Sequence, residues 1–135
     1  MKNTKKIKES SFRSYELEFP LFNFTFLTSM KRYDLNRQEN DSVSKILLKK
    51  LMMLSQLPID KLIALRRESG LEVISENQVK RDVIPNVFSE SGRYEECFNG
   101  LFVLRLGKSG RLLLKRRHEV FYVIAVDTHF DLYSH

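Results

Sequence analysis

In the C-terminal third of the chain, segments with a strand-like pattern of hydrophobic and polar residues are separated by short turn sequences. Three segments, Leu101–Leu106, Arg111–Arg117 and Val120–Asp127, have the length and the residue pattern of ordinary strands. Between them stand Gly107-Lys108-Ser109-Gly110 and the polar pair His118-Glu119, which are typical of turns. The pattern predicts a three-stranded antiparallel meander.

Two strand-like stretches precede this region near the N-terminal end. Tyr15, Leu17 and Phe19 alternate with polar residues, the period of a half-buried strand. Pro20 interrupts the alternation, which predicts an edge strand or a strand end there. Residues 21–27 place Phe22, Phe24 and Phe26 on one face. These residues predict either one bent strand or two.

A helical hairpin is predicted in the middle of the chain. Apolar residues follow one another at spacings of three and four at Val43, Ile46, Leu47, Leu51 and Leu54. This helix is expected to start after the candidate caps at residues 40–42 and to run to about Gln56. A second helix is expected to begin at Pro58 and to end at Gly70. A short strand, residues 71–75, follows.

These elements predict an α+β fold with a helical hairpin packed on an antiparallel sheet that ends in the C-terminal meander. We expect the helices on one face of the sheet. Residues 1–11 are polar and basic and are expected to form a flexible tail, and residues 12–135 a single globular domain. Residues 76–99 contain apolar positions but are broken by Pro85, and they receive no assignment.

Composition narrows the class of protein. The chain has a net charge of +6 and a pI near 9.5, which favours an anionic partner or simply solubility. Its single cysteine, Cys97, fits a reducing compartment, and no apolar run approaches the length of a membrane helix. We therefore expect a cytoplasmic protein that does not enter a membrane.

Basic residues concentrate in the predicted meander. From Leu101 to His118 there is no acidic residue. The candidate nucleic-acid-binding residues are Arg105, Arg111, Lys115, Arg116 and Arg117. Strand alternation places Arg111, Lys115 and Arg117 on one face, where a row of cations suits a phosphodiester backbone of RNA or DNA. The alternative is that these side chains only solvate the outer face of the sheet.

Candidate acid–base residues also lie near the C-terminal end: Tyr122, His118 and His129. Histidine changes its protonation most easily near neutral pH, and Asp127 would orient a histidine ring. The alternative is that Asp127 and Thr128 end the strand by local hydrogen bonding. The glycine-lysine-serine-glycine turn lacks the context of a phosphate-binding loop. The sequence predicts neither a metal site nor a cofactor.

The order of elements resembles that of the RelE/ParE superfamily of small toxins, in which two helices precede a basic antiparallel meander. The resemblance covers residues 41–135 and rests on element order and charge. It implies RNA cleavage by basic and tyrosine residues of the sheet and neutralisation by a cognate antitoxin. The matching residues here are Arg111, Lys115, Arg117, Tyr122 and Tyr133.

The end of the chain also resembles the closing strand of a group of small prokaryotic proteins without an assigned activity. The aromatic-rich stretch 121–127, the following His129 and the pair Leu132-Tyr133 carry this resemblance. Phe24-x-Phe26 and Gly70-Leu71-Glu72 fit the group as well. This resemblance implies that residues 121–127 form the closing strand, and it implies a prokaryotic or mobile-element source.

The sequence thus predicts a small nucleic-acid-directed protein, in its sharpest form a toxin-like ribonuclease of a toxin–antitoxin or mobile-element system. The alternative is a non-enzymatic, protein-binding accessory protein of a phage or mobile element. Whether the chain is an enzyme stays open at this point. A cognate antitoxin or another protein is the expected protein partner, and the edge strand before Pro20 would allow a homodimer.

Overall fold

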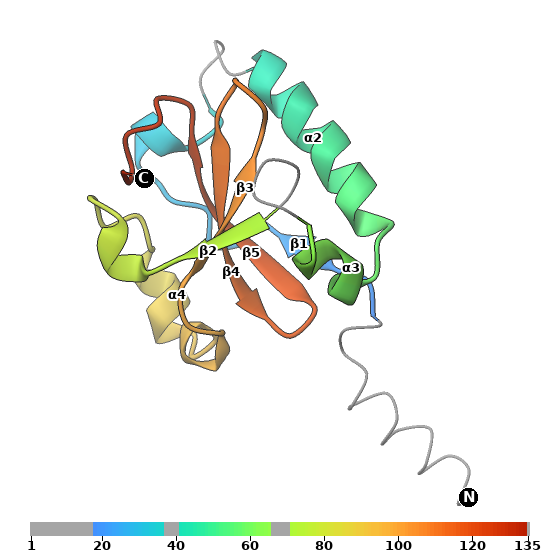
Figure 1. Cartoon of the computed structure of the whole chain (residues 1–135). Helices are drawn as coiled ribbons and strands as arrows, with labels where there is room; N and C mark the ends of the chain where they lie inside the picture. Colours follow the sequence, from blue (N-terminus) through green and yellow to red (C-terminus); the bar gives the residue numbers. More distant parts are fainter. Residues whose placement is uncertain (1–17, 37–40, 66–70, 135) are drawn as a thin grey trace, which may run out of the picture.

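A five-stranded mixed sheet forms the centre of the molecule in the computed structural model, which describes residues 18–36, 41–65 and 71–134 (Figure 1). The strand order is β1-β5-β4-β3-β2. The strands are β1 (Leu21–Asn23), β2 (Leu71–Ile74), β3 (Leu101–Arg105), β4 (Arg111–Arg117) and β5 (Val120–Asp127). The expected basic tail, residues 1–11, and the strand expected around Tyr15 and Leu17 lie outside the described residues.

The predicted C-terminal meander is confirmed. β3, β4 and β5 pair antiparallel in chain order, and β2 adds to β3, also antiparallel. The sheet is nevertheless mixed, because β1 pairs parallel with β5 and occupies the far edge. β1 ends at Asn23, earlier than predicted, since the Asn23 side chain accepts a hydrogen bond from the Thr25 backbone N–H and turns the chain.

Helices connect these strands. The long helix is α2 (Asp41–Ser55), and the shorter ones are α3 (Ile59–Ile63) and α4 (Asn86–Glu90). Three 3-10 turns accompany them: η2 (Lys31–Tyr33), η4 (Glu76–Gln78) and η5 (Tyr94–Glu96). The predicted helical hairpin is present as α2 and α3, with Pro58 at the start of α3, but α3 ends at Ile63 and not at the predicted Gly70. Among the described helices, none is both long and apolar enough to cross a membrane.

Both faces of the sheet are covered, whereas the sequence suggested helices on one face only (Figure 1). We call the first the α2 face, where α2 and α3 pack on Leu112, Leu114, Phe121 and Val123. We call the second the α4 face, where η2, α4 and the C-terminal residues cover the sheet. Part of this second layer comes from residues 76–99, whose irregular pattern did not predict a covering layer.

The α4 face is built on aromatic rings. Phe88 of α4 is fully buried and stacks on Phe26 with 4.3 Å between ring centroids. It also packs edge-on against Tyr94, at 5.3 Å, and lies tilted against Tyr122, at 5.0 Å. Such pairs add to the stability that burial alone provides. These contacts attach the connection between β2 and β3 to the centre of the sheet.

A β-bulge in β5 changes which residues share a face. Leu113 pairs with Ala125 and Leu114 with Val123, so Ile124 is the extra residue. With strict alternation, Ala125 would share the face of Phe121 and Val123, but Ile124 and Ala125 both pack into the core of the α4 face. The bulge therefore also brings Asp127 to the side of Arg111.

Candidate functional site

Arg111, the first of the predicted phosphate-binding residues, is buried in an ion pair. Its Nε lies 3.1 Å from Oδ2 of Asp127, and the two side chains are 3% and 0% exposed. Its guanidinium stacks 3.6 Å above the Tyr133 ring and donates to the Tyr133 carbonyl oxygen at 2.7 Å. Arg111 thus holds the C-terminal segment against the sheet and does not face solvent.

The remaining predicted basic residues do not form an open row either. Arg116 is buried on the α2 face, where its guanidinium lies 4.5 Å from the Phe98 ring and its Nε donates to the His118 carbonyl oxygen. Arg117 is 35% exposed and pairs with Glu96 at 2.8 Å. Arg105 is half-buried at the end of β3. The described structure therefore presents no continuous cationic stripe along β4.

The three predicted acid–base residues lie apart from one another. Tyr122 is buried among the rings of the α4 face. His118 stands in the β4–β5 turn with a positive φ of 50°, and His129 lies beyond the other end of β5. The eight residues of β5 separate the histidines by about 26 Å at 3.3 Å per residue.

Asp127 supports the chain end and does not orient a histidine ring. Its carboxylate accepts the backbone N–H groups of His129, Asp131 and Leu132, at 3.2, 3.3 and 2.9 Å. The His129 ring is exposed and its Nδ1 lies 3.3 Å from the Thr128 hydroxyl. This is the local termination of the strand that the sequence offered as the alternative to a catalytic role.

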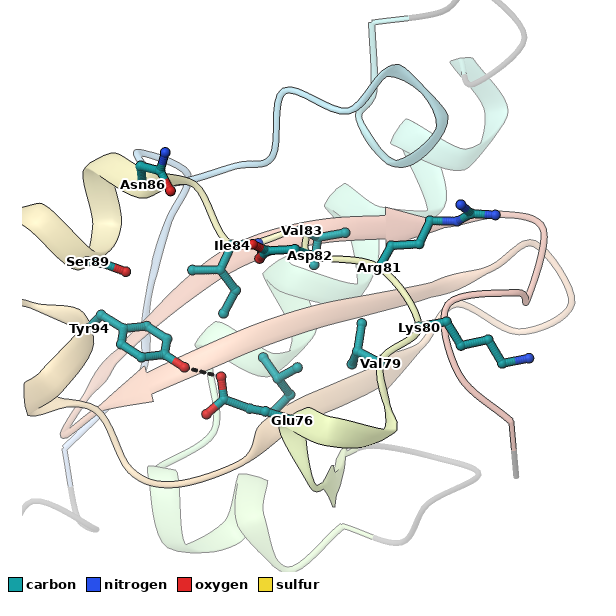
Figure 2. Close-up of a pocket in the computed structure, with 11 residues that line it drawn as sticks. Glu76, Val79, Lys80, Arg81, Asp82, Val83, Ile84, Asn86, Ser89 and Tyr94 are labelled. Carbon is teal, nitrogen blue, oxygen red and sulfur yellow. Dashed lines mark hydrogen bonds between the residues drawn. The ribbon is translucent and has the colours of Figure 1, made fainter.

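A polar pocket of about 400 Å³ lies on the α4 face, in the connection between β2 and β3. Figure 2 shows Glu76 and Tyr94 at one end and Lys80 and Arg81 at the other. The rest of the wall consists of Val79, Asp82, Val83, Ile84, Asn86, Ser89 and Leu101. Its volume falls within the range of pockets that hold small ligands.

Lys115 is the one predicted phosphate-binding residue that lies beside this pocket. Its Nζ is 2.9 Å from Oε2 of Glu76, 2.9 Å from the Gly100 carbonyl oxygen and 5.0 Å from the centre of the Tyr94 ring. The Tyr94 hydroxyl donates to Oε1 of Glu76 (Figure 2). A carboxylate, a phenol and a buried ammonium group therefore form one connected triad.

The electrostatics of the triad favour a protonated phenol. Burial, followed by the hydrogen bond and the charge of Glu76, raises the pKa of the Tyr94 hydroxyl above its ordinary value. Lys115 lies within ion-pair distance of Glu76. By geometry and side-chain chemistry, Glu76 is placed as a proton acceptor and Tyr94 as a proton donor.

Local sequence positions each member of the triad. Ser75 and Gln78 form a capping box around η4, which fixes the backbone of Glu76. Gly100 has a φ of +85°, and a Cβ there would lie 2.8 Å from the Ile74 carbonyl oxygen. Only glycine fits this turn, and the turn presents the carbonyl oxygen that Lys115 binds.

A second hydrogen-bonded chain lies at the basic end of the pocket. Arg81 Nε donates to the Tyr33 hydroxyl, which donates to Asp131, and Arg32 binds the same carboxylate at 2.7 Å. Desolvation opposes ionisation of Asp131, yet the hydrogen bonds from Arg32 and Tyr33 hold its pKa below the ordinary value. This chain connects the pocket wall to η2 and to the C-terminal segment.

Cys97 is close to the triad but is poorly suited to nucleophilic attack. Burial raises the pKa of its thiol to about 11, against an ordinary 9.0. We expect the folded protein to react with iodoacetamide about a hundredfold more slowly below pH 9 than the denatured chain, because each pKa unit removes tenfold of the thiolate. The rate as a function of pH measures this. Equal rates for both forms would contradict the assignment.

Within the described ranges, no group of three or more histidine, cysteine or carboxylate side chains is placed to hold a metal ion. Comparison of the chain with known protein families, characterised proteins and solved structures gives no significant match.

Proposed function

We propose that the protein acts on nucleic acid and that, in its sharpest form, it is a toxin-like ribonuclease with its active site in the pocket of the α4 face. The observation that carries the proposal is the triad of Glu76, Tyr94 and Lys115 at the end of a polar pocket. The overall charge of +6 supports an anionic substrate.

The two ends of the pocket suit different parts of an RNA strand. Lys80 and Arg81 are exposed at one end and suit a phosphate of the backbone. Asp82, Asn86 and Ser89 supply further hydrogen-bonding groups in the wall, which suit a base edge or a sugar. The proposed orientation places the reacting phosphate next to Glu76 and Tyr94.

The proposed reaction is an internal phosphoryl transfer. Glu76 takes the proton of the ribose 2′-hydroxyl, whose oxygen attacks phosphorus. The bond from phosphorus to the 5′-oxygen breaks, and Tyr94 gives its proton to the leaving oxygen. The products are a 2′,3′-cyclic phosphate and a 5′-hydroxyl end. The proton then passes from Glu76 to Tyr94 along their hydrogen bond, and Lys115 stabilises the carboxylate that reappears.

The test is cleavage of an end-labelled single-stranded RNA by the purified full chain. We expect Glu76→Gln and Tyr94→Phe each to lower the cleavage rate by about 10²–10⁴, the usual contribution of a general acid or base. Glu95→Gln is the matched control, because Glu95 is exposed on η5 outside the pocket and its variant should cleave normally. Thermal unfolding checks that each variant is folded.

Induced expression of the native chain in a bacterial host tests the toxin form directly. Arrested growth with degraded RNA is the expected result, and Glu76→Gln should restore growth. Normal growth with intact RNA would contradict the ribonuclease proposal. RNA affinity that does not fall with salt would contradict recognition of the phosphate backbone, since such contacts release counterions.

A non-enzymatic, protein-binding protein is the second candidate, because large apolar side chains are exposed on α2 and beside β1. Under this alternative the triad only attaches the β2–β3 connection to the sheet. Intact RNA together with a lowered melting temperature in Glu76→Gln would favour it.

A further inference from the structure

Large apolar side chains are exposed along one side of α2 and at the start of β1. Leu48, Met52 and Leu21 are 61%, 56% and 60% exposed. Phe19 and Met53 add to the same surface. Exposed apolar side chains are unremarkable when scattered, but a contiguous patch marks an interaction site.

The side chains form two neighbouring hollows. The first, of about 600 Å³, lies between α2 and β1 and is lined by Phe19, Leu21, Leu48 and Met52 among others. The second, of about 540 Å³, is lined by Lys49, Met52, Met53, Gln56 and Leu57. Met52 and Gln56 line both hollows. The two hollows form one surface, which we call the α2–β1 groove.

The positive charge of the α2–β1 groove indicates which kind of segment can bind there. Lys49 is the charged residue among those that line the hollows, and neither hollow is lined by a carboxylate. Lys45 stands one turn before Lys49 and is also exposed. A bound segment therefore meets apolar side chains in the groove and lysines along α2, while Glu18 stands beside Phe19 at the opposite border.

Two occupants from the chain itself match this charge poorly. A second copy docked groove to groove would bring the same lysines together, at an electrostatic cost. Residues 1–17 contain five basic and two acidic residues, so they carry a net charge of the same sign as the groove. Carboxylates on a different protein complement the lysines.

We propose that the α2–β1 groove binds a segment of a partner protein that carries at least two large apolar side chains flanked by carboxylates. The apolar side chains fill the hollows on either side of Met52, and the carboxylates pair with Lys45 and Lys49. This surface lies on the α2 side of the sheet, away from the pocket of the α4 face. Binding there is independent of the proposed nucleic-acid site.

The test uses two labelled synthetic helical peptides and the full chain, with binding measured by fluorescence anisotropy. Both peptides carry leucine at positions i, i+3, i+4 and i+7, and the other positions are glutamate in one and lysine in the other. We expect the glutamate peptide to bind at least about tenfold more tightly, an energy difference of about 1.4 kcal/mol. Higher salt should narrow this difference.

Variants locate the binding. Met52→Glu and Lys49→Glu should each weaken the glutamate peptide at least about tenfold. Val87→Glu is the matched control, because Val87 is an equally exposed apolar residue on α4 and should leave the affinity unchanged. No binding, equal binding of both peptides, or a loss in Val87→Glu would overturn the proposal. A dimer in sedimentation that Met52→Glu dissociates would also overturn it, because a second copy would then fill the groove.

Discussion

Replacing Asp127 by alanine is expected to lower the free energy of unfolding by about 3–5 kcal/mol, the usual effect of removing one partner of a buried ion pair. The guanidinium of Arg111 would be left buried without its counter-charge. The backbone N–H groups of three residues after β5 would lose their acceptor at the same time. Both losses act on the segment that closes the α4 face.

The opposite substitution, Arg111→Met, should cost less, about 1–3 kcal/mol. Asp127 would keep its backbone hydrogen bonds, and the methionine would retain part of the packing on Tyr133. Urea unfolding of both variants measures the difference. Arg32→Met is the control, since Arg32 forms an exposed ion pair with Asp131 and its loss should change the free energy of unfolding much less than either buried substitution.

The outcome also bears on the predicted role of Arg111. If Arg111→Met lost RNA affinity without any loss of stability, Arg111 would be a phosphate-binding residue, as the sequence predicted. A larger loss of stability in Arg111→Met than in Asp127→Ala would contradict the asymmetry that the backbone hydrogen bonds imply.

Phe88→Ala should lower the free energy of unfolding by about 3–5 kcal/mol, because it removes a fully buried ring and leaves a cavity. The ring contacts Phe26, Tyr94 and Tyr122, so its loss loosens three separate segments on the α4 face. Urea unfolding gives the energy. Hydrogen exchange should show the largest loss of protection in residues 76–99.

The neighbouring residue supplies the control. Val87→Ala alters the same helix at an exposed position and should change stability by less than about 0.5 kcal/mol. If Phe88→Ala were as mild as Val87→Ala, the aromatic cluster would not be what holds α4 on the sheet.

The regular helices and strands were predictable because the pattern of apolar residues within each segment determines its secondary structure. The strands of the meander and the span of α2 follow from periodicity within each segment, and the structure confirms them. The parallel pairing of β1 with β5 was not predictable in this way, since nothing in residues 21–23 records which distant edge they join. The partial exposure of Ile46 was not predictable either. Periodicity shows which residues share one face of a helix, but it does not show how much of that face other segments cover.

The placement of the basic residues shows a different limit. Arg111, Lys115 and Arg117 were predicted on one face, but their acidic partners come from elsewhere in the chain. Asp127 reaches Arg111 through a bulge that strict alternation does not contain, and Glu76 and Glu96 belong to the stretch without a regular pattern. The lack of acidic residues within one stretch of the sequence therefore did not predict the charge of the surface that this stretch forms in the folded protein.

The candidate site was missed for the same reason. Glu76 and Tyr94 lie 18 residues apart in irregular connections. Lys115 was singled out on charge, with a different role. The sequence did contain one signal of the site, the capping box Ser75-x-x-Gln78, which fixes the backbone of Glu76. The same pattern occurs at the start of many helices, so it does not indicate a functional site.

Parallel pairing between the first and the last described strand has a consequence for synthesis on the ribosome. β1 leaves the exit tunnel early, yet its partner β5 is made about a hundred residues later, several seconds at usual translation rates. During that interval α2 has no completed sheet to cover. The residues around Asp127 and Tyr133 emerge after all five strands and then close the structure, so a nascent chain stalled before them would expose its aromatic interior to chaperones.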